Sequence, residues 1–414
     1  MYRIAMLSVH TCPLAALGGK ETGGMNVYVR ELSRHLGPRG FSVDIYTRSQ
    51  NPDLPKVRQL WPNVRVIHLP AGPERPYDRR LVYDHLPEFL QNLRDFVRKE
   101  SVQYDLLHSH YWLSGWVARE LSREWVSIPI IHMYHTLGRM KDLAAPAGTE
   151  PEPNIRIQVE EEIAHFADVI VAATPLDKEQ IINLCGADPQ KVRVIPPGVD
   201  LELFRPIPCA RARIELGLEE PNRQMILFVG RLDPMKGLET LLEAICLLRE
   251  RHSEEGPASP YLAIIGGEED EGETLSEAIE CLEKLKREVG AEDVLSFLGS
   301  RAQDTLPYYY SAAAVTVVPS RYESFGMVAL ESMACGTPVI ASRVGGLMHT
   351  VIDGKTGFLV PENDASALAD KLQLVLNDAA LRERLSVNAL QHAQGFGWPL
   401  VADRIAALYR DTLV

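Results

Sequence analysis

The sequence has few cysteines and lacks any paired cysteine motif. Six cysteines are spread over 414 residues, and no two form a Cys-x-x-Cys pair. A disulfide-rich secreted domain or a structural zinc site needs closely spaced cysteines. The pattern therefore predicts reduced, mostly buried thiols in a cytoplasmic protein.

Long apolar runs and an excess of basic residues are also missing. No apolar run approaches the roughly 18 residues that suggest a membrane-spanning helix, and the first residues show no signal-peptide core or cleavage site. The formal net charge is −13, whereas non-specific nucleic-acid binding needs a broad basic surface. We expect neither membrane insertion nor nucleic-acid binding, although a local pocket can still hold a small anion.

The chain does contain regular alternation of short β-branched runs with amphipathic segments. This alternation predicts parallel sheets covered by helices on both faces. The expected strands fall in two series, at 2–7, 42–47, 64–69, 104–108, 129–132 and 169–173, and at 225–230, 261–265, 294–298, 315–318, 338–341 and 357–360.

The pause between the two series predicts two domains. We expect an N-terminal Rossmann-like domain over 1–195, a linker near 204–208, and a C-terminal Rossmann-like domain over 205–397. The amphipathic segment 398–414 is expected to be a helix that packs back on the first domain. Two doubly wound α/β domains side by side leave a central cleft at the carboxyl ends of their strands, where ligands of such folds bind.

The strongest local motif follows the first strand of the second series. Arg231 and Lys236 stand in the segment Gly-Arg-Leu-Asp-Pro-Met-Lys-Gly, between that strand and the next helix. Two cations at a helix N-terminus add to its free N–H groups and its positive dipole end. This setting favours a diphosphate site, and the alternative is a pair of solvated surface charges.

A second motif places two glutamates seven residues apart around a short turn. Glu323 precedes Ser324, Phe325 and Gly326, which we expect to open a helix that carries Glu331 on the same face. Carboxylates accept hydrogen bonds from vicinal sugar hydroxyls, so one can hold a sugar and the other a ribose. The alternative is a helix cap and a solvated charge.

Two weaker signals lie in the first domain. Gly23 and Gly24 stand just before a helix, where glycine lets backbone approach a phosphate, although a plain turn is equally compatible. Histidines also gather at two strand ends, in His108-Ser-His110 and His132-Met-Tyr-His135. Their spacing fits no tight zinc pattern, so we expect hydrogen bonding to sugar or phosphate and no metal site.

Together these residues resemble those of one family. The motifs Gly23-Gly24, His108-Ser-His-Tyr-Trp-Leu-Ser-Gly115, Pro197-Gly-Val-Asp200, Gly230-Arg-Leu with Lys236-Gly, and the Glu323/Glu331 segment resemble the retaining GT-B glycosyltransferases of the sucrose-phosphate synthase and mycothiol glycosyltransferase type. The likeness runs from residue 4 to about 409 and implies a GT-B fold, a UDP-sugar donor and a phosphorylated acceptor.

The resemblance also implies roles for individual residues. Arg231 and Lys236 would stabilise the leaving diphosphate, which Gly23 and Gly24 would approach from the other domain. Donor-sugar hydroxyls would bind Glu323 and the turn Ser324, Phe325 and Gly326; Glu331 would hold the ribose, and Leu298 would flank the base. His135 would contact the donor sugar near the reacting carbon. The acceptor phosphate would bind Tyr111, Thr136 and Arg156, with Arg139 or Lys141.

The same resemblance leaves two acceptors open. The stretch His135-Thr-Leu-Gly-Arg-Met-Lys141 is similar to that of sucrose-phosphate synthases and favours transfer of glucose to fructose 6-phosphate. The segments 25–28 and 108–115 are closer to the mycothiol enzyme, which transfers N-acetylglucosamine to inositol phosphate. Arg156 precedes three glutamates, so a surface ion pair is its plainer interpretation.

The expected chemistry is retention without a metal or other cofactor. No carboxylate pair is placed to act as nucleophile and acid in the manner of glycosidases, so front-face attack is expected. Among other classes, a nucleotide-sugar epimerase would need Tyr-x-x-x-Lys, and a phosphorylase would need a pyridoxal lysine and a longer chain. A two-domain sugar-binding protein would share the cleft but would carry an export signal. The sequence does not indicate the oligomeric state.

Overall fold

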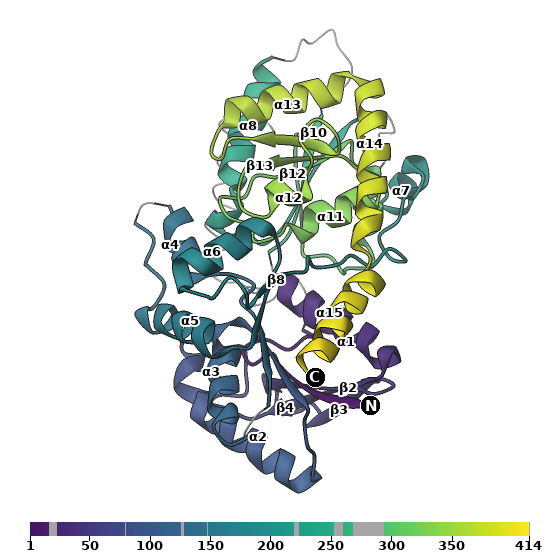
Figure 1. Ribbon diagram of the computed structural model, residues 1–414. Helices are drawn as coiled ribbons and strands as arrows, with labels where there is room; N and C mark the ends of the chain where they lie inside the picture. The colour runs from purple at the N-terminus through teal and green to yellow at the C-terminus, as the bar shows by residue number, and fades with distance from the viewer. Residues whose placement is uncertain are drawn as a thin grey trace.

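The computed structural model describes residues 1–15, 23–78, 80–125, 128–146, 148–218, 223–251, 260–267 and 294–413. These residues form two α/β lobes, one above the other in Figure 1. Each lobe has a single sheet built from consecutive parts of the chain. The predicted fold class of two doubly wound α/β domains is confirmed.

The first sheet has eight strands in the order β3-β4-β2-β1-β5-β6-β7-β8. All neighbours are parallel except β3 and β4. The strands are β1 (Tyr2–Leu7), β2 (Phe41–Arg48), β3 (Val57–Trp61), β4 (Val64–Leu69), β5 (Leu106–His110), β6 (Ile130–Met133), β7 (Val169–Ala172) and β8 (Val192–Val194).

The second sheet is parallel throughout, in the order β11-β10-β9-β12-β13-β14. The strands are β9 (Met225–Val229), β10 (Tyr261–Ile265), β11 (Leu295–Gly299), β12 (Val315–Val318), β13 (Val339–Ser342) and β14 (Gly357–Val360).

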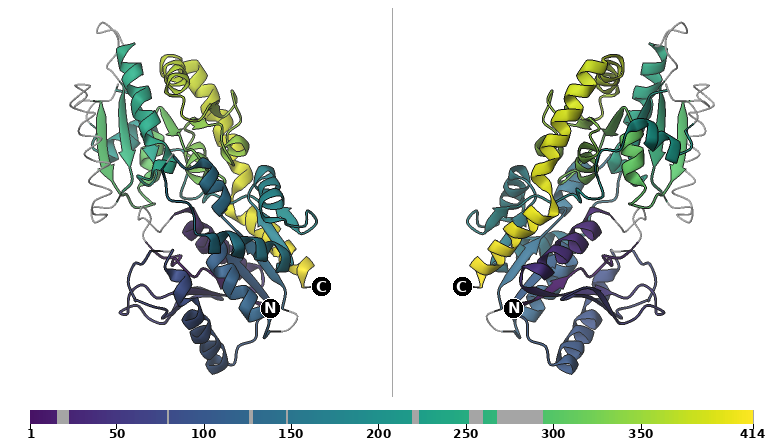
Figure 2. Two further views of the ribbon diagram at one scale, coloured as in Figure 1. Left: turned by 90° about the vertical axis from the view of Figure 1, so that its left-hand side faces the viewer. Right: turned by 90° about the vertical axis from the view of Figure 1, so that its right-hand side faces the viewer.

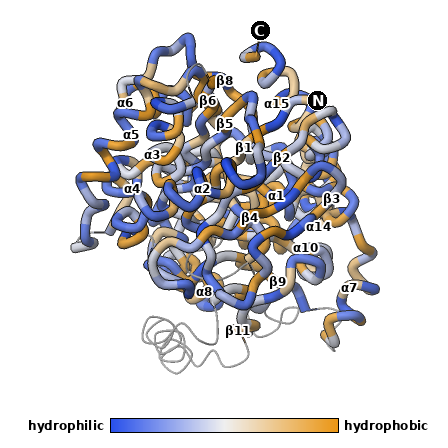
Figure 3. Tube along the Cα trace, turned by 90° about the horizontal axis from the view of Figure 1, so that it is seen from below, coloured by the Kyte–Doolittle hydropathy of each residue, from blue (hydrophilic) through white to orange (hydrophobic). Residues whose placement is uncertain are grey.

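Helices cover both faces of the two sheets, because successive side chains of a parallel strand enter two separate cores. In β1, Ile4 and Met6 belong to one apolar cluster, while Ala5 and Leu7 belong to another. Figure 3 shows hydrophilic and hydrophobic residues alternating along the surrounding helices. Within the described residues, no helix is long and apolar enough to span a membrane.

The helices of the first lobe are α1 (Gly24–Leu36), α2 (Leu86–Glu100), α3 (Tyr111–Ser122), α4 (Gly138–Ala144), α5 (Asn154–Phe166) and α6 (Pro175–Cys185). Those of the second are α7 (Cys209–Glu215), α8 (Leu238–Glu250), α10 (Leu306–Ala312), α11 (Met327–Ala334), α12 (Leu347–Thr350), α13 (Ala365–Asn377) and α14 (Ala379–Ala393).

The last helix, α15 (Trp398–Thr412), runs from the second lobe onto the first, and both views of Figure 2 show α14 and α15 descending along one side. The Arg39 guanidinium donates to the Asp403 carboxylate at 2.8 Å, and the Tyr409 hydroxyl lies 2.6 Å from Nδ1 of buried His108. The C-terminal helix therefore packs on the first lobe, where it contacts α1 and reaches His108 in β5.

The two chain segments that cross between the lobes pair with each other. The amide of Val199 donates to the carbonyl of Phe396 at 2.8 Å, and the amide of Trp398 donates back to Val199 at 3.3 Å. Gly198 lies against the Trp398 indole so closely that a Cβ there would be 2.7 Å from Cδ2. Phe204, the first residue of the expected linker, is buried, whereas Arg205, Pro206 and Pro208 are exposed.

One strand was not expected from the sequence. β3 is an antiparallel edge strand joined to β4 by a tight turn at Pro62 and Asn63, and Asn63 has a φ of 63°. Its residues are mostly exposed and include a charged and an amide side chain, so the β-branched pattern of buried strands is absent. The strand β5 also extends to His110, two residues beyond the predicted end.

Candidate active site

A pocket lies between the two lobes. Its walls come from α1, the crossing segment 198–204, the loop before α10, the first turns of α11, and the first residue of α15. The lining residues are Val27, Arg30, Glu31, Gly198, Val199, Asp200, Leu203, Phe204, Gln303, Met327, Glu331 and Trp398.

Lys236 and Glu323 form an ion pair in the second lobe. The Lys236 ammonium is 2.5 Å from Oε2 of Glu323, and both side chains are largely but not fully buried. Lys236 ends a short 3-10 turn, Pro234–Lys236, in which the Asp233 carboxylate accepts from the Met235 amide at 2.9 Å. The predicted cation and the predicted sugar-binding carboxylate are therefore neighbours.

Arg231 follows the end of β9 and points toward the same turn. Its guanidinium lies 3.5 Å from the Asp233 carboxylate, and about a third of its side chain is exposed. The helix α8 begins at Leu238, after Gly237 with a φ of 65°. Arg231 and Lys236 therefore precede the helix, as the sequence predicts, and keep access to solvent.

The turn Ser324, Phe325 and Gly326 does not open the helix, contrary to the prediction. Helix α11 begins at Met327, and Gly326 is its N-cap with a φ of 92°, where a side chain would be strained. Glu323 thus lies in a loop before the helix that carries Glu331. The two glutamates have separate partners.

The Glu323 loop is held by two glycines of the following strand–helix turn. The amide of Gly346 donates to the carbonyl of Glu323 at 2.7 Å. A Cβ on Gly345 would be 2.0 Å from that carbonyl, and one on Gly346 would be 2.2 Å from the carbonyl of Ser324. The buried Phe325 carbonyl accepts from the Thr350 hydroxyl at 2.5 Å. Close backbone packing therefore fixes the position of the Glu323 carboxylate.

Glu331 lies deeper, on the wall of the interlobe pocket. Its Oε2 accepts a hydrogen bond from the Tyr310 hydroxyl at 2.9 Å. Burial raises the pKa of this carboxyl to about 7, although hydrogen bonds from Tyr310 and Gln303 and the charge of Arg30 lower it. The Glu331 carboxylate can accept hydrogen bonds from hydroxyls in the pocket.

Gly24 faces the second lobe at the beginning of α1. A Cβ on Gly24 would be 3.0 Å from Sδ of Met327, the first residue of α11. The Gly23 amide donates to Oδ1 of Asn26 at 3.0 Å, and the Asn26 amide group is anchored on Thr11 and Cys12. The N-termini of α1 and α11 therefore lie close together across the pocket. The preceding residues 18–22 lie outside the described part of the chain.

Two bulky side chains with left-handed backbone stand at the carboxyl ends of neighbouring strands. Tyr111 follows β5 with a φ of 71°, and His135 follows β6 with a φ of 62°. Such conformations cost of order 1–3 kcal/mol and concentrate at functional sites. Nε2 of His135 lies 2.9 Å from Nδ1 of His110, and burial lowers the pKa of His135 to about 3. His135 is therefore neutral at physiological pH.

Three of the predicted acceptor residues form one contact group, which we call the Arg156 cluster: Tyr111, Thr136 and Arg156. Nη2 of Arg156 donates to the backbone carbonyl of Thr136 at 2.9 Å and lies 3.2 Å from its hydroxyl. The guanidinium lies 4.9 Å from the centre of the Tyr111 ring. A planar cation stacked on an aromatic ring beside a hydroxyl can hold a phosphate.

The plainer interpretation of Arg156 from the sequence was a surface ion pair, and the structure contradicts it. The side chain is fully buried, and it bonds to Glu160 at 2.7 Å and to Glu152 at 3.0 Å. A buried guanidinium needs such partners because an uncompensated charge is costly inside a protein. Glu160 also accepts from the Gly138 amide at 2.9 Å, which ties α4 to α5.

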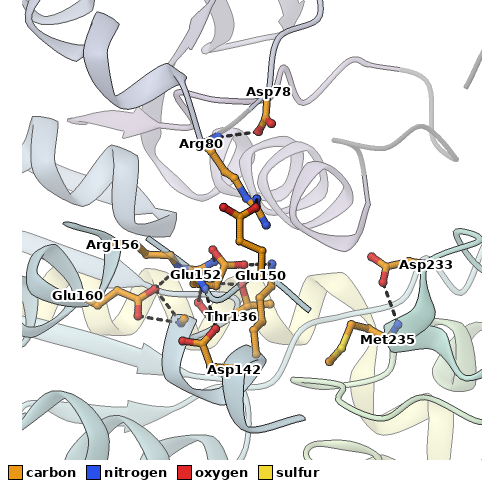
Figure 4. A network of polar contacts seen from close by, with 12 residues as sticks. Asp78, Arg80, Thr136, Asp142, Glu150, Glu152, Arg156, Glu160, Asp233 and Met235 are labelled. Atoms are coloured by element: carbon orange, nitrogen blue, oxygen red, sulfur yellow. Dashed lines mark hydrogen bonds and ion pairs between the residues drawn. The ribbon is translucent and has the colours of Figure 1, made fainter. Parts of the chain in front are cut away.

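The structure brings Lys141 to this cluster but not Arg139. The Lys141 ammonium is 3.3 Å from Glu152, the same carboxylate that pairs with Arg156, whereas the half-exposed Arg139 pairs with Glu161 on the surface. Figure 4 shows a further cation, Arg80, which pairs with Glu150, two residues before Glu152. Nη1 of Arg80 lies 2.6 Å from Oε2 of Glu150.

The histidines do not form a metal site in the part of the chain that the structure describes. No group of three His, Cys, Asp or Glu side chains there is arranged to hold a metal ion. His132 instead bonds to Ser109 at 2.8 Å, and His108 bonds to Tyr409. Their burial lowers the pKa of His108 to about 3 and that of His132 well below its usual value.

Some residues of the pocket were not predicted. Leu298 lies near the end of edge strand β11, but it is Gln303, five residues further on, that lines the pocket together with Arg30 and Glu331. Tyr310, which does not line the pocket but donates to Glu331, was not predicted either. Neither Gln303 nor Tyr310 stands in a motif, so only the three-dimensional proximity to Glu331 reveals them.

Two family models match most of the chain. Residues 22–203 match Glycosyltransferase Family 4, and residues 213–392 match Glycosyl transferases group 1. A curated relative from Acidothermus cellulolyticus, a D-inositol 3-phosphate glycosyltransferase, is 41% identical over 99% of this chain and 90% of its own length. A relative of the same name from Kribbella flavida is also 41% identical, over 99% and 95%.

Solved structures share the fold across the whole chain. A sucrose-phosphate synthase from Thermosynechococcus elongatus is 38% identical, with a TM-score of 0.90 and 99% of both chains covered. Anabaena HepE in complex with UDP-glucose, at 20% identity and a TM-score of 0.75, shares the fold alone. Given relatives that are 41% identical over nearly the full length, the chain belongs to the GT-B glycosyltransferases and is an enzyme that transfers a sugar.

Proposed function

We propose that the enzyme transfers a hexose, with retention, from a UDP-sugar to a phosphorylated sugar or polyol. One observation carries the proposal. Lys236 and Glu323 follow the carboxyl ends of β9 and β12 in the second lobe, and Tyr111 and Thr136, which contact Arg156, follow those of β5 and β6 in the first lobe. The interlobe pocket lies beside α11. In doubly wound folds this edge of the sheet binds ligands.

The donor half of the proposal rests on the second lobe. Arg231 and Lys236 offer charge to a diphosphate, Glu323 offers a carboxylate to sugar hydroxyls, and Glu331 offers one to the ribose. The glycine backbone at Gly24 allows a close approach from the first lobe. Solved neighbours in complex with UDP or UDP-glucose support this class of donor at the level of the fold.

The acceptor half rests on the Arg156 cluster and on Lys141. A phosphate would lie between the Arg156 guanidinium, the Thr136 hydroxyl and the Tyr111 ring, with Lys141 adding charge. His135 follows the strand next to that of Tyr111, so it lies where the donor sugar would meet the acceptor. Arg139 has no part in this proposal because it pairs with Glu161 on the surface.

The proposed step is a front-face displacement. The acceptor hydroxyl oxygen forms the new bond to the anomeric carbon as the bond from that carbon to the diphosphate oxygen breaks, and the hydroxyl proton passes to a phosphate oxygen of the leaving group. Arg231 and Lys236 stabilise the charge on the departing UDP, and no metal or other cofactor takes part. The protein supplies orientation and fixed charges.

Two acceptors have separate support. Full-length relatives named D-inositol 3-phosphate glycosyltransferase favour inositol phosphate as the acceptor. Fructose 6-phosphate, with sucrose 6-phosphate as product, is favoured by the similarity to a solved sucrose-phosphate synthase and by the stretch His135 to Lys141. Both acceptors present a phosphate and neighbouring hydroxyls, which is what the Arg156 cluster can recognise.

The test is a matrix of two donors and two acceptors. UDP-glucose and UDP-N-acetylglucosamine are each incubated with fructose 6-phosphate and inositol phosphate, and product is followed by mass spectrometry. We expect transfer with one donor–acceptor pair. We expect no transfer when unphosphorylated fructose or inositol replaces the acceptor of that pair. Equal rates with unphosphorylated acceptors would contradict the proposed phosphate site, and stabilisation of the protein by free sugar without UDP would favour a binding protein.

A further inference from the structure

The Glu331 carboxylate is held from two different sides. On one side the Tyr310 hydroxyl of α10 donates to Oε2 at 2.9 Å, within the core of the second lobe. On the other side Gln303 hydrogen-bonds to the carboxylate at the pocket. One carboxylate therefore has a partner in the protein interior and a partner on the ligand side.

Tyr310 has little freedom to turn away. Its side chain is completely buried, and its ring packs against Phe204 with a centroid distance of 6.1 Å. Its backbone carbonyl accepts from the Thr337 hydroxyl at 2.6 Å. The hydroxyl is therefore fixed in position relative to α11, which carries Glu331.

Gln303 is the hydrogen-bond partner of Glu331 that ligand hydroxyls can replace. Its Oε1 accepts from Nη2 of Arg30 at 2.6 Å, which leaves the amide N–H groups to donate toward Glu331. Arg30 belongs to α1 of the other lobe, and both Arg30 and Gln303 line the pocket. Two vicinal hydroxyls entering the pocket can replace the Gln303 donor without disturbing Tyr310.

We propose that Tyr310 is a positioning residue of the donor site, because its hydroxyl holds the Glu331 carboxylate turned toward the pocket for a ribose diol. The inference rests on the proposed function, in which Glu331 binds the ribose. A carboxylate without this anchor would rotate, and it would lose the orientation that two hydroxyls of one ring require at the same time.

The hydrogen bond from Tyr310 also affects the protonation of Glu331. Burial raises the pKa of Glu331 to about 7, whereas the bonds from Tyr310 and Gln303 and the charge of Arg30 lower it. The pocket also contains Glu31 and Asp200, and Cys335, which directly follows α11, interacts electrostatically with Glu331. Removing the Tyr310 hydroxyl removes a stabilising partner of the ionised form, so protonation of Glu331 moves to higher pH.

The test compares UDP with 2′,3′-dideoxyuridine diphosphate, which lacks the diol. Dissociation constants are measured by calorimetry for the wild type and for Tyr310→Phe, Tyr309→Phe and Glu331→Gln, at pH 8 and pH 6.5. Tyr309→Phe is the matched control because the neighbouring hydroxyl accepts from Arg301 instead. Thermal unfolding verifies that each variant is folded.

We expect the wild type and Tyr309→Phe to prefer UDP strongly. In Tyr310→Phe the affinity for UDP falls about tenfold, as expected for loss of one hydrogen bond to a charged group, while the affinity for the dideoxy analogue is unchanged. The loss is larger at pH 6.5 than at pH 8, and the turnover number at saturating donor stays near that of the wild type.

The outcomes separate the inference from the function on which it rests. If Glu331→Gln loses the preference for the diol and Tyr310→Phe keeps it, the positioning role of Tyr310 is overturned. If Glu331→Gln keeps the preference, the proposed ribose site itself is wrong. Should Tyr310→Phe fail to fold, Thr337→Val releases the Tyr310 backbone, and unchanged preference in that variant overturns the inference.

Discussion

The Lys236 ammonium and the Glu323 carboxylate lie 2.5 Å apart, although their motifs are separated by 87 positions in the sequence. In the proposed complex, Lys236 neutralises the diphosphate and Glu323 binds the donor sugar. The ion pair means that each side chain is already oriented before the donor arrives. Such preorganisation lowers the cost of arranging charges during the reaction.

The first prediction concerns the two cations of the diphosphate site. Arg231→Ala and Lys236→Ala should each lower kcat by about 10²–10³, because fixed charges at a developing anion contribute on this scale. Steady-state kinetics with saturating donor measure the effect. Lys355→Ala, at an exposed turn of the same lobe, is the control. Unchanged kinetic constants in Arg231→Ala would show that the diphosphate binds elsewhere.

The second prediction is a pH dependence of donor affinity. Burial raises the pKa of Glu331 to about 7, and only the ionised carboxylate accepts two hydrogen bonds from a ribose. Donor affinity should therefore be constant above this pKa and should fall about tenfold per pH unit below it, as proton linkage requires. A profile of KM for the donor between pH 5.5 and 8.5 tests this. In Glu331→Gln the donor affinity should not fall further at acidic pH.

The third prediction concerns the carboxylate that already neutralises the acceptor site. Glu152 pairs with both Lys141 and Arg156, so an incoming phosphate must compete with it. Glu152→Gln should lower KM for the phosphorylated acceptor several-fold, in the range of a weakened buried ion pair, while KM for the donor is unchanged. Glu161→Gln, which affects only the surface pair with Arg139, is the control. A raised acceptor KM would mean that Glu152 is needed to orient Arg156 and Lys141.

The sequence predicted most parallel strands well because most of them are buried on both faces. β1, β4, β10, β12 and β14 have the bounds expected from their apolar runs. The edge strand β3 was missed, since one of its faces is open to solvent and its residues carry no apolar pattern. β3 depends on its pairing with β4 rather than on its own composition, whereas the edge strands β11 and β14 carry apolar runs and were predicted.

Contacts between the candidate residues were predictable where those residues follow strand ends. Tyr111, Thr136 and Arg156 meet as the resemblance implied, because β5 and β6 are neighbours and α5 packs against α3. Contacts that depend on side-chain direction were not predictable: Arg139 and Lys141 are two residues apart, yet one bonds to Glu161 and the other to Glu152. The same limit applies to Gln303, which reaches Glu331 from a loop without a motif.

The fourth prediction concerns the two hydrogen-bonded chain segments that connect the lobes, near Gly198 and near Trp398. A Cβ on Gly198 would stand 2.7 Å from Cδ2 of the Trp398 indole, and both residues line the interlobe pocket. Gly198→Ala should therefore destabilise the protein by about 1–3 kcal/mol, the usual cost of overpacking a buried site, and should raise KM for the donor. Urea unfolding and donor kinetics measure the two effects.

The control for this prediction lies three residues before Trp398. A Cβ on Gly395 would meet nothing within 4 Å, so Gly395→Ala should leave both stability and donor KM near those of the wild type. The comparison isolates the contact with the indole from the general effect of replacing glycine. Since Val199 and Phe396 hydrogen-bond at the same place, a shift of Trp398 moves both crossing segments together. Equal behaviour of the two variants would show that the crossings are loosely packed and that donor affinity does not depend on them.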